Sequence, residues 1–363
     1  MKDENIQLNS LLQRSNIESN KQFQRLSEKT QVLMPQNGQL EIVKNRLTHS
    51  YEVATSSLMM ASNIAALNNI DLNDIDFKGS LYGCALLHDV GHGPFGHDGA
   101  DLIDQKFKAL GVDEGFSDNN NNLVVIRKNN IVVNDYTIAS VIKYPTKLYS
   151  FQKEQYIPIL NAAINEDKTH FSTLGLNLSN QTKTISCQIM DEADRNSYAT
   201  SDFADFLCLG NTIDIEVMHR MSKESSLSCR YRELITLSNI IKDNSKTSIK
   251  AYFNELKNRF NCNYNITDEG LIVIDKDLED YREFLYELCL EFYIYPIRDQ
   301  SFHKENMKKL ESYMDDVISG KCSPSEHYTA KINTAKNDVE KYTYMRDMIA
   351  EVSDWYILNY YAN

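Results

Sequence analysis

The chain has 363 residues, 42% of them hydrophobic, a length that suits one large or two modest domains with a substantial core. Its formal net charge of −13 argues against bulk binding to nucleic acid, which requires basic patches that displace counterions. The N-terminal stretch is polar, and the longest apolar runs, such as residues 81–87, are far shorter than the roughly 20 residues that span a bilayer. We therefore expect neither a signal peptide nor membrane association.

The seven cysteines are odd in number, widely scattered, and never form a CxxC pair. In a chain of this size, that pattern predicts reduced and mostly buried thiols rather than a disulfide framework. It favours a cytoplasmic location.

Most of the chain has helical periodicity, with only six prolines and 13 glycines to interrupt it. Two stretches have strand-like composition and are predicted as local hairpins, residues 123–133 with a turn at Asn129-Asn130 and residues 266–275 around Asp268-Glu269-Gly270. The asparagine run 119–122 and the stretch 165–182 are predicted as loops. The expected fold class is all-α, with small β-hairpin excursions.

A working division follows from these patterns. We expect a polar N-terminal segment over 1–20, a helical catalytic core over 21–210, and a helical C-terminal region over 211–363. The last segment of that C-terminal region is predicted to return to the active site.

Four of the eight histidines lie between positions 49 and 97. His88 and Asp89 follow an apolar helical stretch and precede His92, a Gly-Pro loop and His97. A single histidine on an apolar helix is more often a satisfied core residue, but the spacing H-D-x-G-H-x-x-x-x-H is unlike a core pattern, because buried charge must be paired or bound to metal. Imidazole and carboxylate together suit a divalent transition metal.

A third segment contains Asp194, Tyr198 and Asp202 at i, i+4 and i+8, so one helix face would carry all three. Such a face would place a metal carboxylate at one end and a sugar-recognising pair at the other. The alternative is an ordinary solvated polar face.

Taken together, these segments resemble the HD superfamily, and the neighbouring residues resemble its deoxynucleoside triphosphate triphosphohydrolase (dGTPase) branch. The matching segments keep their order along almost the whole chain: Phe23-Gln24-Arg25-Leu26, Lys29-Thr30-Gln31-Val32, Asn45-Arg46-Leu47-Thr48-His49-Ser50, the stretch from Leu87 to His97, Lys143-Tyr144-Pro145, Ala193-Asp194 with Tyr198, and Arg346-Asp347 with Ile349-Ala350, Asp354 and Tyr356. The resemblance implies an HD-domain helical core.

The resemblance also implies roles for individual residues. The metal ligands would be His49, His88, Asp89 and Asp194. His97 would be the catalytic histidine near the α-phosphate, with His92 close to the phosphates. The substrate-binding residues would be Gln31 and Val32 beside the deoxyribose and base, Arg46, Lys143 and Arg195 near the phosphates, and Tyr198 and Asp202 at the sugar.

Two positions depart from the family pattern. The acidic residue usual three positions after the catalytic histidine is Ala100 here, and Asp118 occupies the place of a usual histidine. We hypothesise that the carboxylate missing at position 100 is regained at Asp118, which would then orient and charge His97 as part of the catalytic set. Misregistration around the asparagine run is the alternative.

The predicted activity is metal-dependent hydrolysis of a deoxynucleoside triphosphate, dGTP by default, to deoxynucleoside and inorganic triphosphate. Mn²⁺ is the expected cofactor, with Mg²⁺, Fe²⁺, Co²⁺, Ni²⁺ or Zn²⁺ as alternatives. The resemblance also implies a homo-oligomer. Two other functions stay open: an HD phosphodiesterase or nucleotidase acting on another nucleotide, and a catalytically weak nucleotide-sensing relative.

Overall fold

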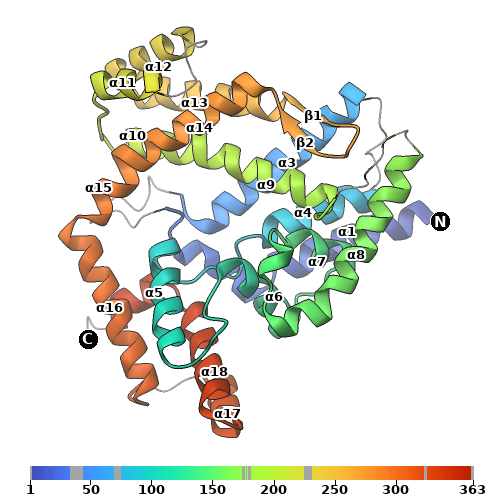
Figure 1. The fold of residues 1–363 in the computed structure, drawn as a ribbon, viewed down its shortest axis with the longest axis vertical. Coiled ribbons are helices and arrows are strands. Elements are labelled where there is room, and N and C mark those ends of the chain that lie inside the picture. Colours follow the sequence, from blue (N-terminus) through green and yellow to red (C-terminus); the bar gives the residue numbers. More distant parts are fainter. Residues whose placement is uncertain are drawn as a thin grey trace.

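The structure is a computed structural model that describes residues 2–32, 44–68, 75–173, 176, 178, 181–224, 231–322 and 325–360. Helices dominate these residues, and their sheet consists of two short strands (Figure 1). The predicted all-α fold class is confirmed. Within the described ranges, no helix combines the length and the apolar character needed to cross a membrane.

The N-terminal half contains both short and long helices. In chain order they are α1 (Lys2–Glu18), α2 (Lys21–Gln24), the 3-10 turn η1 (Arg25–Glu28), α3 (Arg46–Asn68), α4 (Ile75–Leu87), α5 (Gly96–Ala109), α6 (Asp118–Lys128), α7 (Asp135–Val141), η2 (Pro145–Lys147), α8 (Ser150–Ser172) and α9 (Ile185–Ser197).

The C-terminal half adds the hairpin and further helices. They are the π-helical turn η3 (Tyr198–Asp202), α10 (Phe203–Cys208), α11 (Ile215–Glu224), α12 (Tyr231–Asp243), α13 (Lys246–Asn261), β1 (Tyr264–Ile266), β2 (Ile272–Ile274), α14 (Lys276–Cys289), the π-helical turn η5 (Leu290–Ile294), α15 (Tyr295–Arg298), α16 (Ser301–Ile318), α17 (Glu326–Thr334), α18 (Asp338–Glu351) and α19 (Asp354–Tyr360).

The largest hydrophobic core lies around α3, α4 and α9, which pack against one another in the middle of the molecule (Figure 1). Ala54 and Ala61 on α3 are fully buried, and their small side chains permit close helix packing. A second core joins α5 to α16, α18 and α19, so helices at the end of the chain complete the packing of a helix that follows the histidine segment.

One predicted hairpin is confirmed. Strands β1 and β2 pair antiparallel, with Tyr264 opposite Ile274 and Ile266 opposite Ile272. Gly270 lies in the connecting turn with a φ of 76°, a left-handed conformation that favours glycine. The apolar residues at alternate positions face the core.

The other predicted hairpin, over residues 123–133, is wrong, and so is the predicted loop over 119–122. Both segments fall largely in α6. This helix begins with the negatively charged Asp118 and ends with the positively charged Arg127 and Lys128, and charges of these signs stabilise the N-terminal and C-terminal ends of a helix. Asn130 then turns the chain with a φ of 50°. The asparagine amides that usually favour loops are instead bound by tertiary contacts, as described below.

The predicted loop over 165–182 is wrong in its first part, because α8 continues to Ser172. Phe171 and Asp167 in this last portion of the helix are buried. Asp167 accepts hydrogen bonds from the Tyr136 hydroxyl at 2.6 Å and from the backbone N–H of Ile185 at 2.8 Å. Packing against neighbouring elements therefore keeps this polar stretch helical.

Candidate active site

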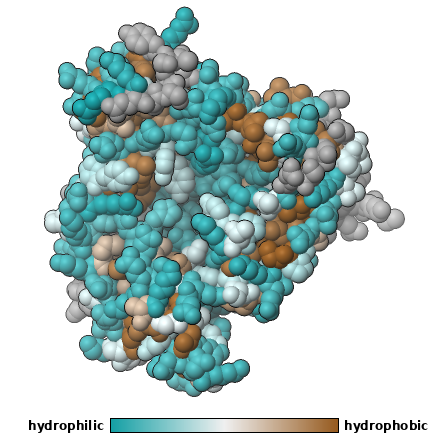
Figure 2. Space-filling view, in the orientation of Figure 1, coloured by the Kyte–Doolittle hydropathy of each residue, from teal (hydrophilic) through white to brown (hydrophobic). Residues whose placement is uncertain are grey.

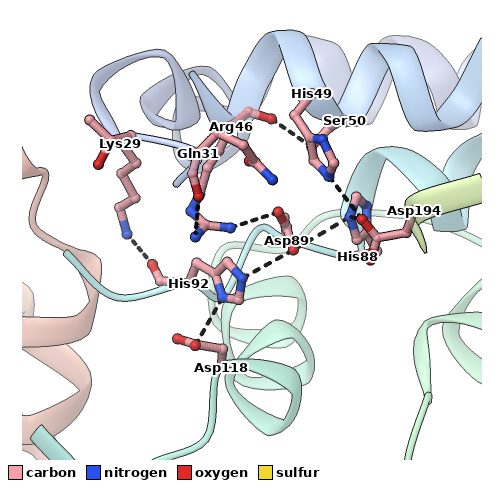
Figure 3. Close-up of polar contacts among 12 residues, drawn as sticks. Lys29, Gln31, Arg46, His49, Ser50, His88, Asp89, His92, Asp118 and Asp194 are labelled. Atoms are coloured by element: carbon pink, nitrogen blue, oxygen red, sulfur yellow. Dashed lines mark hydrogen bonds and ion pairs between the residues drawn. The ribbon is translucent and has the colours of Figure 1, made fainter. Parts of the chain in front are cut away.

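Helix ends bring the predicted metal ligands together. His49 lies in the first turns of α3, His88 and Asp89 follow the last residue of α4, and Asp194 lies near the end of α9. Because α3, α4 and α9 pack against one another, residues separated by more than a hundred positions meet at one point. Figure 3 shows His49, His88, Asp89 and Asp194 converging from these elements.

Three of these residues form a tight group. One ligand atom from each of His49, His88 and Asp194 lies within 4.8 Å of the other two, and all three side chains are buried. The Nε2 of His49 is 3.0 Å from Asp194 Oδ1, and the Nε2 of His88 is 3.5 Å from the same oxygen. Asp89 adjoins the group, with its Oδ1 at 3.4 Å from His88 Nε2.

The tautomer of His88 suits a metal ligand. Its Nδ1 lies 2.7 Å from the Ala85 carbonyl oxygen, which can only accept, so Nδ1 carries the proton. Nε2 therefore faces the carboxylates of Asp89 and Asp194, at 3.4 and 3.5 Å, and this buried nitrogen makes no hydrogen bond to a described residue. A backbone acceptor behind a ligating imidazole is the usual way to orient such a ring. The nitrogen and oxygen donors fit a divalent ion.

Charges around the group keep its carboxylates ionised. Burial opposes ionisation of Asp194, yet Lys143 and His88 hold its pKa well below the usual value. The ammonium of Lys143 lies 2.7 Å from Asp194 Oδ2. The pKa of Asp89 is likewise well below its usual value despite burial, because His88, His92 and Arg46 surround it. Arg46 donates from Nη1 to Asp89 Oδ2 at 2.8 Å.

A second set of side chains lies on the opposite side of Asp89. His92 Nε2 is 3.2 Å from Asp89 Oδ1, and His92 Nδ1 is 3.1 Å from Asp118 Oδ2. The same Asp118 oxygen is 3.8 Å from Nδ1 of His97, while Asp118 Oδ1 accepts from the Gly93 N–H at 3.0 Å. Figure 3 shows His92 between the two carboxylates. Asp118 thus lies beside both histidines, while Ala100 packs in the second core.

The two histidines differ in their electrostatics. Burial and nearby Arg46 lower the pKa of His92 to about 3, so its ring is neutral near physiological pH. The contact with Asp118 raises the pKa of His97 above its usual value. His97 is also exposed, with two-thirds of its side chain accessible, whereas His92 is buried. Of the two rings, His97 is the one suited to carry and give up a proton.

A cavity of about 520 Å³ opens beside these residues. Figure 2 shows the corresponding face as mainly hydrophilic around a hollow near its centre. The predicted residues that line the cavity are Gln31, Val32, Asp89, His92, His97, Lys143, Asp194, Arg195, Tyr198 and Asp202. The predicted residues outside its lining are His49, His88, Arg46 and Asp118, all of which are buried.

Three of the predicted substrate-binding residues, Gln31, Asp202 and Arg46, have buried polar atoms without a hydrogen-bond partner among the described residues. Both amide atoms of Gln31 and Oδ2 of Asp202 are buried and have no hydrogen-bond partner among the described residues. Buried polar atoms are normally paired, so unpaired ones at a cavity wall are typical of a ligand site. Arg46 leaves only Nε unpaired, and both Arg46 and Arg195 have carboxylate partners. The guanidinium of Arg46 pairs with Asp89, and that of Arg195 pairs with Glu192 and Glu283.

Asp194, Tyr198 and Asp202 were expected on one face of a continuous α-helix, but the helix changes its geometry between the first and the second of them. The α-helix ends at Ser197, and Tyr198–Asp202 form the π-helical turn η3. A π-turn is wider than an α-turn and recurs at functional sites. All three side chains still reach the cavity, and the Tyr198 ring lies 5.6 Å from the His49 ring.

Sequence reasoning missed one wall of the cavity and one support of the histidine segment. The wall comes from α14, η5 and α15 and consists of Arg282, Glu283, Tyr286, Cys289, Ile294 and Arg298. No motif in the sequence marks these residues.

The support is the asparagine run: Asn121 donates to the Gly91 carbonyl at 2.7 Å, and Asn122 donates to the His88 carbonyl and accepts from the Gly91 N–H. The four consecutive asparagines were the only sequence feature that could have indicated this supporting role.

Comparison with known proteins agrees with this geometry. Residues 46–199 match the family model described as HD domain. The chain is therefore similar to HD domains over this range, which covers less than half of its 363 residues. HD domains bind divalent metal ions, and the group of His49, His88 and Asp194 lies within the matched range.

The chain is also similar to curated proteins that share one description. It is 30% identical over 196 residues to a deoxyguanosinetriphosphate triphosphohydrolase-like protein of Wolinella succinogenes, covering 52% of this chain and 46% of that protein. A protein of the same description from Vibrio cholerae is 29% identical over 235 residues, 63% of this chain and 53% of that protein. One from Bifidobacterium longum is 22% identical over 384 residues, 92% of this chain and 78% of that protein.

The chain thus spans about half the length of the first two relatives. The resemblance predicted from the motifs is confirmed.

Proposed function

We propose that this protein hydrolyses a deoxynucleoside triphosphate to the deoxynucleoside and inorganic triphosphate, with dGTP as the default substrate. The observation that carries the proposal is the buried group of His49, His88 and Asp194 beside a cavity whose Gln31 and Asp202 have unpaired polar atoms. The descriptions of the relatives supply the substrate class.

Four residues would hold the metal: His49, His88, Asp194 and the adjoining Asp89. Their nitrogen and oxygen donors suit Mn²⁺ best, with Mg²⁺, Fe²⁺, Co²⁺, Ni²⁺ and Zn²⁺ as alternatives. A bound divalent ion would lower the pKa of a coordinated water and neutralise charge on the α-phosphate. Asp89 is also held by Arg46, so the arginine would orient this ligand besides supplying positive charge near the phosphates.

In this proposal, His97 is the general acid. When water attacks the α-phosphorus, the bond from phosphorus to the 5′-oxygen breaks, and that oxygen requires a proton. His97 is exposed to the cavity and has a raised pKa, so it would donate that proton. Asp118 would orient and charge His97, and neutral His92 would lie close to the phosphates.

The remaining cavity residues would bind the substrate. Lys143 and Arg195 would contact the phosphates after exchanging their present carboxylate partners for phosphate oxygens. Gln31 and Asp202 would pair with sugar hydroxyl groups, because their polar atoms are otherwise unsatisfied. The Tyr198 ring would crowd the 2′ position of a ribose and so favour deoxyribose, with Val32 beside the sugar and base.

A product assay tests the proposal. The purified protein is incubated with each of the four dNTPs and with GTP, with Mn²⁺ added, and products are separated by ion-exchange chromatography. We expect equimolar deoxynucleoside and triphosphate, with little product from GTP. Release of monophosphate or orthophosphate would instead indicate a phosphodiesterase or nucleotidase. Binding without turnover would indicate a nucleotide sensor.

The variant His97→Ala tests the assignment of His97 as the general acid. We expect kcat to fall by about 10² to 10⁴, the usual contribution of a positioned general acid. Metal content, measured by plasma mass spectrometry, should not change, because His97 is not in the ligand group. Unchanged turnover in His97→Ala would contradict the assignment of the acid.

A further inference from the structure

The junction between α18 and α19 contacts the active site through Asp354. This side chain is completely buried. Its Oδ2 accepts hydrogen bonds from the Thr30 backbone N–H at 2.8 Å and from the Thr30 hydroxyl at 2.6 Å. Its Oδ1 accepts from the backbone N–H of Phe95 at 2.7 Å. One carboxylate therefore joins three parts of the chain that are far apart in sequence.

Both of the joined segments lead directly into the cavity. Thr30 precedes Gln31 and Val32, which line one side of the cavity. Phe95 itself lines the cavity and lies two residues before His97. Asp354 is outside the lining, so it contacts neither substrate nor metal and acts through the segments that it holds.

Lys29 makes a parallel connection. Its buried ammonium donates to the His92 carbonyl oxygen and, at 3.0 Å, to the Ala350 carbonyl oxygen. Figure 3 shows Lys29 directed at the His92 carbonyl, with the pale red ribbon of C-terminal helices on the same side. The segment from His92 to Phe95 is thus held at its first residue through Lys29 and at its last residue by Asp354.

The backbone at Phe95 needs such support. Phe95 has a φ of 58°, a left-handed conformation that is unfavourable for a non-glycine residue. It is also the N-cap residue of α5, and its own side chain caps nothing. Its N–H bond to Asp354 satisfies a buried donor in that strained conformation. The direction in which α5 begins therefore depends on Asp354.

His97 is the residue most sensitive to that direction. It lies in the first turn of α5, and two-thirds of its side chain is exposed. Its described side-chain neighbours are the His92 ring at 5.6 Å and the Asp118 carboxylate at 3.8 Å. Because little packing holds the ring, the backbone largely decides where the imidazole lies.

We infer that Asp354 is a positioning residue for the active site, which sets His97 through Phe95 and the Gln31 segment through Thr30. This inference rests on the proposed function for its catalytic consequence. Asp354 belongs to the C-terminal segment that the motif comparison singled out and to which the proposed mechanism gave no role. Its contacts give this segment of the chain a part in supporting the cavity walls.

Asp354→Asn tests the inference with little change in size. An asparagine has one acceptor oxygen in place of two, so it can serve Thr30 or Phe95 but not both. We expect kcat to fall by about tenfold to a hundredfold, as for a misplaced catalytic group. Metal content should stay at the wild-type value. Amide hydrogen exchange in peptides covering residues 92–97 or 28–32 should become faster.

Glu351→Gln is the matched control. Glu351 lies at the end of α18, and its carboxylate accepts hydrogen bonds from Tyr328 at 2.9 Å and Lys128 at 2.5 Å. Neither of these partners lines the cavity. The control should lower the melting temperature while leaving kcat, KM and exchange at residues 92–97 unchanged.

Thr30→Val is a milder variant for the case in which Asp354→Asn does not fold. It removes only the hydroxyl hydrogen bond and keeps the backbone contact. Thr30 precedes Gln31, which is proposed to bind the substrate, and is far from His97 in the chain. We therefore expect KM to rise, because the weakened hydrogen bond affects substrate binding, while kcat should change less than about twofold.

The inference is overturned if Asp354→Asn leaves exchange at both segments unchanged, or if it speeds exchange without lowering kcat. It is also overturned if Asp354→Asn and Glu351→Gln lower kcat equally. If the wild-type protein hydrolyses no dNTP, the proposed function fails, and exchange at residues 92–97 still decides whether Asp354 holds this segment.

Discussion

The proposed metal side and the proposed acid–base side of the cavity are built in different ways. On the metal side, His49, His88 and Asp194 are buried, and the helices that carry them form the largest core. On the acid–base side, His97 is exposed and lies on α5, whose packing partners include α16 and α18 from the end of the chain.

This difference shows where each side obtains its rigidity. His88 is oriented by Ala85 of its own helix end, and Asp194 by Lys143 from a neighbouring segment. The contact of His97 with Asp118 Oδ2 is longer, at 3.8 Å, so the position of this ring depends more on the α5 backbone, which Asp354 supports from more than 250 positions away. We therefore expect the metal side to tolerate changes in the C-terminal region and the acid–base side to respond to them.

The largest effect should come from the metal side. His88→Ala removes a ligand nitrogen from the centre of the group. The loss of metal should remove several kcal/mol of transition-state stabilisation, so turnover should fall roughly a thousandfold or more. Metal content and dNTP turnover should fall together. His327→Ala, at an exposed histidine outside the cavity, is the control and should change neither. A fully active His88→Ala would refute the metal assignment.

An intermediate effect should come from Asp118. In Asp118→Asn the remaining oxygen can still accept from Gly93, while an amide replaces the oxygen that faces His92 and His97. We expect kcat to fall by about tenfold to a hundredfold, a part of the general-acid contribution. Metal content should be preserved, which separates the two sides of the cavity.

The control for this variant is Asp101→Asn, which alters an exposed carboxylate on the same helix as His97. It should leave kcat unchanged. Equal activity in wild type and Asp118→Asn would show that Asp118 does not replace the carboxylate missing at Ala100.

The smallest effect should come from a carboxyl group away from the cavity. Burial raises the pKa of Asp167 to about 7, although hydrogen bonds from Tyr136 and Ile185 oppose the shift. The folded protein therefore binds this proton more tightly than the unfolded chain, whose aspartate pKa is about 3.9. Asp167 stabilises the fold fully below about pH 4, and that contribution is lost as the pH rises towards 7.

Asp167→Asn should remove this pH dependence, because an amide can donate to the Tyr136 oxygen and accept from Ile185 without ionising. Between pH 4 and pH 7, the free energy of unfolding from urea titrations should decrease less in the variant than in wild type, while kcat stays the same. Parallel stability curves would contradict the assigned ionisation of Asp167.

Local sequence patterns predicted the helical class, the hairpin at residues 266–275 and a metal site at His88 and Asp89, and the resemblance extended that site to His49 and Asp194. These predictions depended on periodicity, turn residues and ligand chemistry, all of which short stretches carry. The resemblance added roles for Gln31, Tyr198 and Asp202. The residues of the HD motif are recognisable because their chemistry restricts both type and spacing.

Tertiary structure alone decided the conformation of the asparagine run. Four consecutive asparagines favour a loop when their amides are free to bond to local backbone. Here the side chains of Asn120, Asn121 and Asn122 bond to the backbone of Lys147, Gly91 and His88 instead. Once distant groups take up the amides, the helix no longer competes with local hydrogen bonds.

The sequence by itself determined which residues have metal-binding chemistry and that most of the chain is helical, because residue type and periodicity are local properties. Only the tertiary structure decided which helices form the far wall of the cavity and that Asp354 joins Thr30 to Phe95. Those arrangements follow from how helices pack around shared cores, and packing depends on contacts between residues far apart in the chain.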